Sequence, residues 1–190
     1  MTAASLLIVP SIATSSAHAS AIDITYSFAG APTGPPVLTG TILTLNGLAN
    51  GSVLSGIPIL DAIWNPVTFA THDVVDITTG LNNGTFMLTF ANGDMLSGNL
   101  FEDDSQVLAT NTGPFTQTLT FTGGTGEFAG ASGTLSGAGV IGATGFTTSG
   151  SGTLNAAGVV PESSSFTLCG MGLLALGAFA RDKLLCLSNR

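Results

Sequence analysis

Apolar and polar residues alternate with a period of two in several stretches between residues 20 and 158. In the first stretch, every second residue is apolar: Ile22, Ile24, Tyr26 and Phe28. Successive side chains of a β-strand point to opposite faces, so this pattern is typical of a strand with one buried and one solvated face. We therefore predict a half-buried β-strand at the start of this region.

A β-hairpin is predicted around the dipeptide Asn92-Gly93. Residues 86–90 place Phe and Leu side chains on one face, and residues 95–101 supply a returning strand. Asn-Gly favours the tight turns that join antiparallel strands, because both residues tolerate positive φ angles.

Two further features extend the β pattern. Alternate residues of a third stretch form one face: Phe115, Gln117, Leu119 and Phe121. The tetrapeptide SGTL occurs at residues 132–135 and again at 151–154, which suits two neighbouring strands but gives too few copies for a solenoid. No stretch here has the period of an amphipathic helix, so we predict β-structure throughout.

The predicted fold is all-β: a single antiparallel β-barrel over residues 20–158, with a β-sandwich as the alternative. An open sheet needs devices such as edge Lys residues to resist edge-to-edge association, whereas a closed barrel has no free edge. Residues 20–158 contain no Lys. This favours the barrel.

Composition limits the function classes. A chain of 190 residues suffices for one ordinary domain. Its only cationic side chains, Arg181, Lys183 and Arg190, lie in the last ten residues, and the formal net charge is -8. The domain therefore has no cation to neutralise nucleic-acid phosphates, clamp an anionic substrate or form a Lys Schiff base, which excludes nucleic-acid binding and those enzyme classes.

Both cysteines, Cys169 and Cys186, lie near the C-terminus. No disulfide can therefore cross-link residues 20–160, although disulfides persist in exported proteins. The two cysteines form no CxxC pair and have no neighbouring His, so we interpret both as structural.

Residues 1–19 have features of a secretory signal peptide. An apolar run over residues 3–10 precedes Ala17 and Ala19, which match the small-residue pattern before a signal cleavage point. Cleavage after Ala19 would leave Ser20 first. The positively charged start of a typical signal is missing, so the alternative is a first helix of a cytosolic domain.

A transmembrane helix is predicted over residues 164–180. These seventeen residues carry no charge, and as a helix they would span about 25 Å, near the lower limit for a bilayer core of roughly 30 Å. Arg181 and Lys183 follow directly and would act as a membrane stop, which predicts a cytoplasmic tail over residues 184–190. A buried helix of a soluble protein is the alternative.

The segment 159–183 resembles the PEP-CTERM sorting signal of exported bacterial proteins. The similarity rests on the motif Val160, Pro161, Glu162 and Ser163, on the Gly-rich apolar run after it, and on the basic residues that follow. Two features depart from the family pattern: Ser163 replaces a second Pro, and the basic cluster is diluted. The resemblance implies export by the general secretory route, temporary inner-membrane anchoring, and processing near Pro161 by an exosortase, a membrane-embedded cysteine transpeptidase.

Residues 121–133 (FTGGTGEFAGASG) are similar to a glycine-rich segment of allene oxide cyclase-like and dirigent-like β-barrels. The match covers thirteen residues. It implies a barrel whose glycines provide positive φ angles or close strand approach at a corner, and it implies no activity.

Candidate catalytic chemistry centres on His72, the only His left after signal removal. Asp73 and Asp76 lie near it in sequence, but residues 20–158 contain no GxSxG nucleophile elbow. With one His, a His-based metal cluster is impossible and a triad would have to be built around that residue alone. We favour a polar loop position for His72.

The remaining candidates are acidic and aromatic side chains. Glu102, Asp103 and Asp104 suggest one side of a calcium site, but their spacing matches no known calcium loop, so a solvated hairpin tip is favoured. Trp64 and Tyr26 suggest sugar stacking, although a core or loop anchor is the commoner role. Carboxylate pairs for glycoside hydrolysis are defined by spatial separation, and no pair stands out.

The sequence thus predicts an exported, non-catalytic structural or adhesive protein of the cell surface or extracellular matrix. Its expected partners are the secretion machinery, an exosortase, the membrane and exopolysaccharide; no catalytic residue, cofactor or metal ligand is assigned. The alternatives are a small secreted barrel enzyme, either a cyclase or isomerase or glycoside-active, and a calcium-dependent surface module. A barrel filled by Phe and Leu favours a structural role, whereas an open mouth lined by His72 or paired acids favours catalysis.

Overall fold

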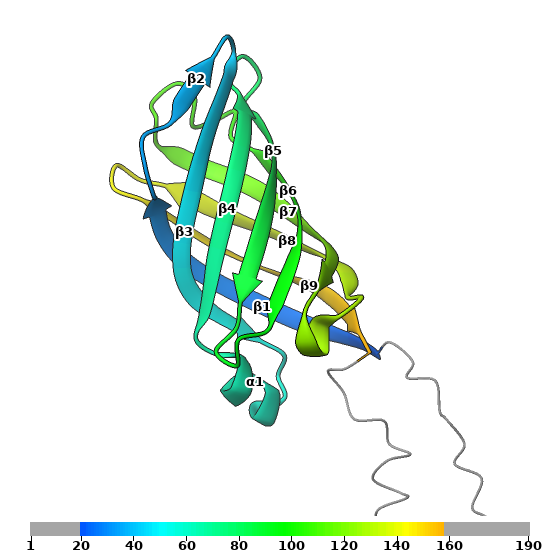
Figure 1. Cartoon of the computed structure of the whole chain (residues 1–190). Helices are drawn as coiled ribbons and strands as arrows, with labels where there is room; N and C mark the ends of the chain where they lie inside the picture. Colours follow the sequence, from blue (N-terminus) through cyan, green and yellow to red (C-terminus); the bar gives the residue numbers. More distant parts are fainter. Residues whose placement is uncertain (1–19, 158–190) are drawn as a thin grey trace, which may run out of the picture.

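The alternating stretches form an antiparallel up-and-down β-barrel, which the computed structural model describes over residues 20–157 (Figure 1). Its strands are β1 (Ser20–Pro32), β2 (Val37–Thr39), β3 (Ile42–Leu54), β4 (Val67–Asp76), β5 (Leu81–Thr89), β6 (Met95–Asp103), β7 (Gly113–Gly124), β8 (Ser132–Ile141) and β9 (Phe146–Ala156). Eight strands close the barrel because β1 pairs with β9 on one side and with β3 on the other. The short strand β2 pairs with β3 beyond the end of β1. The predicted all-β barrel is confirmed, and the sandwich alternative is wrong.

The period-two pattern decides which side chains fill the barrel. The four apolar residues of the first stretch lie on β1 and are at most 6% exposed, and the predicted inward face of β7 is buried in the same way. The Asn92-Gly93 hairpin joins β5 to β6, with Gly93 at a φ of 88°. The two SGTL segments pair across β8 and β9, with Leu135 opposite Gly152.

One helix interrupts the β-structure and corrects the expectation of strands throughout. Helix α1 (Pro58–Trp64) connects β3 to β4, with Pro58 in its first turn, where the missing N–H of Pro is tolerated. Leu60 and Trp64 are its buried residues and are one turn apart. The helix therefore caps one end of the barrel.

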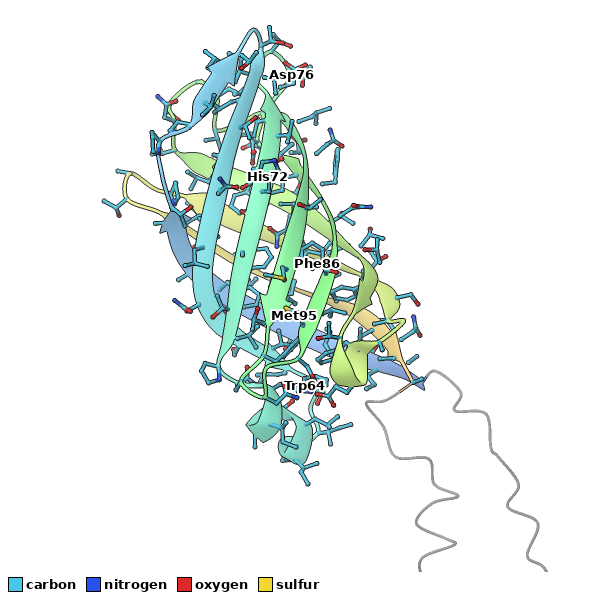
Figure 2. All side chains as sticks on the ribbon, viewed as in Figure 1. Trp64, His72, Asp76, Phe86 and Met95 are labelled. Carbon is cyan, nitrogen blue, oxygen red and sulfur yellow. The ribbon has the colours of Figure 1, made fainter. Side chains whose placement is uncertain are left out.

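The end beside α1 is filled by aromatic side chains and is called the closed end. Trp64 lies at this end (Figure 2). It meets Phe90 and Phe128 there: the ring centroids of Phe90 and Phe128 are 4.4 Å apart, and each lies within 5.7 Å of the Trp64 ring. Phe128 belongs to the 3₁₀ turn η1 (Gly126–Phe128), inside the glycine-rich segment 121–133. Gly126 and Gly130 have φ angles of 57° and 71°, which confirms positive-φ glycines at a corner of the barrel.

The opposite end is called the open end. It is formed by the connections at residues 33–41, 77–80, 104–112 and 142–145. Both ends of the described chain lie at the closed end, because Ser20 pairs with Ala156 across β1 and β9 (Figure 1).

Several predicted features lie outside the described residues. They are the signal peptide 1–19 with Ala17 and Ala19, the sorting motif Val160, Pro161, Glu162 and Ser163, the helix 164–180, the membrane-stop residues Arg181 and Lys183, the tail 184–190, and both cysteines. Within residues 20–157, no helix is long and apolar enough to cross a membrane.

Candidate functional site

A cavity of about 350 Å³ lies inside the barrel at the open end. Its apolar wall consists of Leu45, Phe69, Val75, Phe115, Ile141 and Phe146. Its main polar groups are Thr71, Asp73, Asn82, Glu102 and Asp104. The β8–β9 connection at residues 142–144 also lines the cavity and is itself exposed, so the cavity reaches the surface at this turn.

The strand register places acids among the apolar wall residues. On β4, residues 67, 69, 71, 73 and 75 are all buried and alternate with more exposed neighbours. The same periodicity that directs Phe69 and Val75 inward therefore also directs Asp73 inward. On β6, Leu96 and Leu100 are buried, and Glu102 continues this face toward the open end.

Asn82 of β5 connects the buried Asp73 and the half-buried Glu102. Its side-chain nitrogen Nδ2 donates to Asp73 Oδ1 at 3.0 Å and to Glu102 Oε2 at 2.8 Å. Its oxygen Oδ1 accepts the backbone N–H of Val74 at 3.0 Å, which fixes the orientation of the amide. Thr71 Oγ1 donates to the second oxygen of Asp73 at 2.7 Å. Both oxygens of Asp73 are therefore hydrogen-bonded.

The backbone accommodates this network through Gly84, which lies on β5 against β4. A Cβ atom at this position would lie 2.3 Å from the carbonyl oxygen of His72 and 3.2 Å from the Cα of Asp73. Any larger residue would have to push β5 away from β4 just where Asp73 and Asn82 meet.

Burial and mutual repulsion shift the ionisation of these acids. Burial, followed by the charges of Asp73 and Asp104, raises the pKa of Glu102 to about 8, against the opposing hydrogen bond from Asn82. Burial and the charges of Asp73 and Asp103 raise the pKa of Asp104 to about 6. Burial also raises the pKa of Asp73, although Asn82 and Thr71 stabilise its charged form. Near neutral pH, Glu102 is therefore mostly protonated and Asp104 mostly ionised.

Asp104 has an unused acceptor atom. The residue follows β6 and is only 7% exposed, and its backbone N–H donates to the carbonyl of Gly80 at 2.7 Å. Its buried side-chain oxygen Oδ1 has no hydrogen-bond partner among the described residues. A buried acceptor without a partner is costly, so a donor is expected from whatever occupies the cavity.

A second buried polar pair lies next to this group. Gln117 of β7 is opposite Glu102 in the β6–β7 register, and its Nε2 donates to the Tyr26 hydroxyl at 2.6 Å. Burial raises the pKa of Tyr26. The inward polar groups thus extend along the wall from β4 to β7, and Gln117 reaches Tyr26 of β1, which is not adjacent to β7 in the sheet.

His72 does not line the cavity, and no triad forms around it. It lies on β4 rather than in a loop, so the expected loop position is wrong. Its exposed ring nitrogen Nδ1 is 2.9 Å from Asn46 Oδ1 (Figure 2). Asp73 points inward, and Asp76 accepts hydrogen bonds from Thr78 in the turn after β4. Alternation along one strand separates the adjacent residues His72 and Asp73.

The consecutive acids at residues 102–104 do not form one cluster. Asp103 is exposed and accepts the backbone N–H of Ser105 at 3.0 Å, whereas Glu102 and Asp104 line the cavity with Asp73. The expectation of a solvated hairpin tip is therefore wrong for Glu102 and Asp104. In the part of the chain that the structure describes, no three or more acidic, His or Cys side chains are arranged to hold a metal ion.

Trp64 and Tyr26 are buried rather than available for sugar stacking at the surface. Trp64 is 0% exposed and its indole Nε1 donates to Glu127 Oε1 at 2.8 Å, while Tyr26 stacks on Phe28. The preferred interpretation of Trp64 as a core anchor is confirmed.

Sequence reasoning missed Asn82 and the convergence of three acids. The available signal was the position of Asp73 in the inward register of an otherwise apolar strand face, since buried acids are rare unless they have a role. No family model, curated protein sequence or solved structure significantly matches this chain.

Proposed function

We propose that the domain is an exported β-barrel that binds a small, largely apolar organic molecule in the cavity at its open end. The observation that carries this proposal is the cavity itself: about 350 Å³, with mainly apolar walls and a few convergent polar groups. Small-molecule sites commonly have this composition and volumes of roughly 300–1,000 Å³.

The distribution of side chains supports binding over a purely structural role in an extracellular matrix. A structural barrel gains most stability when its interior is filled, as it is around Trp64. At the open end, the inward positions instead hold the buried Asp73 and Asn82 and the half-buried Glu102, and placing such polar groups in the interior costs stability. Such groups are retained more readily where they serve a ligand.

Export remains part of the proposal and rests on the two terminal segments of the sequence. Their attachment points, Ser20 and Ala156, are paired at the closed end. A membrane tether after Ala156 would therefore join the barrel at the end opposite the cavity mouth. This arrangement suits a binding protein that is held at, or released from, the cell envelope, with an exosortase as the processing partner.

A barrel enzyme is the second candidate, and the acids of the cavity favour it. A protonated Glu102 and ionised carboxylates in one cavity would provide an acid and a base for proton transfer on a bound substrate. This chemistry suits an isomerase or cyclase. It requires the same ligand-binding cavity, so the binding test comes first.

The test blocks the cavity mouth. Ile141 lines the cavity, while its neighbour Val140 is 52% exposed and faces outward. Ile141→Trp is expected to abolish binding of an apolar probe such as 2-phenylethanol to the full chain, measured by saturation-transfer NMR. The matched control Val140→Trp is expected to bind like the unmodified chain. Equal binding by both variants, or none by the unmodified chain, would contradict the proposal.

A further inference from the structure

The cavity holds acidic groups that no protein cation offsets. Asp73 comes from β4, Glu102 from β6 and Asp104 from the connection after β6, and all three line the cavity. Residues 20–157 contain no Lys or Arg. Their only His, His72, is exposed on the outer face of β4, where its ring contacts Asn46.

Two buried side-chain acceptors have no hydrogen-bond partner among the described residues, Asp104 Oδ1 and Gln117 Oε1, and of these two residues only Asp104 lines the cavity. Each oxygen of Asp73 accepts one hydrogen bond, from Thr71 or Asn82, and Asn82 also donates to one oxygen of Glu102. Asp104 is more than nine-tenths buried, lines the cavity, and keeps Oδ1 without a partner in the described structure. A ligand that donates a hydrogen bond and carries positive charge would satisfy both the free acceptor and the uncompensated charge.

We infer that the cavity takes a small organic cation, with an ammonium group against Asp104 and an apolar body against Phe69, Phe115 and Phe146. This inference rests on the proposed function and narrows it to one ligand class. An inorganic cation would use the acids but not the aromatic wall. A neutral alcohol would satisfy the free acceptor without balancing the charge.

The inference can also be tested on the unmodified chain, because binding of a cation should be coupled to protonation of the cavity acids. The ionisable groups that influence one another here are Tyr26, His72, Asp73, Glu102, Asp103 and Asp104. An ammonium ligand favours ionised carboxylates, so its binding lowers their raised pKa values and releases protons. Because the pKa of Asp104 is about 6, affinity is expected to fall about tenfold from pH 7 to pH 5, as this carboxylate becomes protonated.

The experiment compares two probes of nearly equal shape, 2-phenylethylammonium and 2-phenylethanol, by isothermal titration calorimetry on the full chain at pH 7 and pH 5. At pH 7 the ammonium probe is expected to bind at least tenfold more tightly than the alcohol. Only the ammonium probe is expected to lose affinity at pH 5 and to release protons on binding.

The matched variants are Asp104→Asn and Asp103→Asn, which remove a carboxylate from the cavity wall and from the adjacent exposed position. Asp104→Asn is expected to weaken ammonium binding at least tenfold and to leave alcohol binding unchanged, while Asp103→Asn changes neither. Far-UV circular dichroism and thermal melting check that both variants fold. If Asp104→Asn does not fold, the comparison of the two probes at two pH values on the unmodified chain still tests whether the cavity prefers an organic cation.

The outcomes separate the inference from the proposed function. Equal binding of both probes at both pH values would overturn the organic-cation inference and leave the ligand-binding barrel intact. Displacement of the ammonium probe by calcium chloride at equal ionic strength, but not by sodium chloride, would overturn it in favour of a metal ion. If neither probe binds and Ile141→Trp alters nothing, both the inference and the proposed function fail.

Discussion

The two ends of this barrel have differently filled interiors. At the closed end, the interior is filled by aromatic side chains from the connecting segments, namely Trp64 of α1, Phe90 just after β5 and Phe128 of η1, and the indole N–H donates to Glu127. At the open end, inward positions on β4 to β6 hold polar groups around a cavity. The interior is therefore packed where connecting segments insert aromatic side chains, and it is hollow where inward strand positions are polar.

The two ends therefore have different roles: the closed end contributes most to stability, and the open end holds the polar groups of the candidate site. Burial of aromatic rings at the closed end contributes hydrophobic free energy and offset ring contacts. The open end gains less from burial, because Asp73 and Glu102 repel each other and share one amide. We therefore expect substitutions at the two ends to change different observables.

The largest effect of a substitution is expected at the closed end, for Trp64→Ala. Removal of this fully buried ring leaves a cavity beside Phe90 and Phe128 and is expected to lower the free energy of unfolding by about 3–5 kcal/mol, measured by urea denaturation. The control is Met87→Ala, since Met87 is 41% exposed on β5; its effect should stay within about 0.5 kcal/mol. If Trp64→Ala lowers the free energy of unfolding no more than Met87→Ala does, the closed end is not the main stabilising region.

The second prediction concerns pH and the open end. Glu102 has a pKa near 8 in the folded chain and an ordinary value of 4.5, so unfolding releases its proton at intermediate pH. The free energy of unfolding should therefore fall as pH rises from about 4.5 to 8, by on the order of 5 kcal/mol, and level off above that. Glu102→Gln should remove most of this decline in urea unfolding across pH 5–9.

Asp103→Asn is the control for this prediction. Asp103 is the exposed neighbour of Glu102, and hydrogen bonds from Ser105 lower its pKa. Its substitution should leave the decline above pH 5 in place. If the free energy of unfolding of Glu102→Gln falls with pH as it does in the unmodified chain, another group causes the fall. The contrast between the two ends would then be weaker.

A smaller effect is expected for Gly84→Ala, where β4 and β5 approach beside the acidic network. The added methyl would contact the carbonyl of His72 and is expected to cost about 1–3 kcal/mol in urea denaturation. Gly34→Ala is the matched control, because a Cβ atom there meets no heavy atom within 4 Å. Equal stabilities of these variants would mean that the strands adjust freely and that the network is less constrained than the contacts indicate.

The local pattern located several of the strands and predicted an all-β fold. Period-two alternation located β1 and β7, and Asn92-Gly93 located the β5–β6 hairpin, because side-chain direction and turn preference depend on neighbouring residues alone. Helix α1 escaped prediction because it is only seven residues long and shows two buried positions. Such a segment is too short to establish a helical period.

The candidate site was decided by the tertiary structure. Asp73, Asn82 and Glu102 lie on three different strands, and only the β4–β5–β6 register brings their polar atoms within hydrogen-bond distance. The same register separates neighbours in sequence, placing His72 outside the barrel and Asp73 inside. The sequence by itself determined which residues alternate, because that property is local. Which of them meet around a cavity depends on barrel closure and strand register, which are properties of the whole chain.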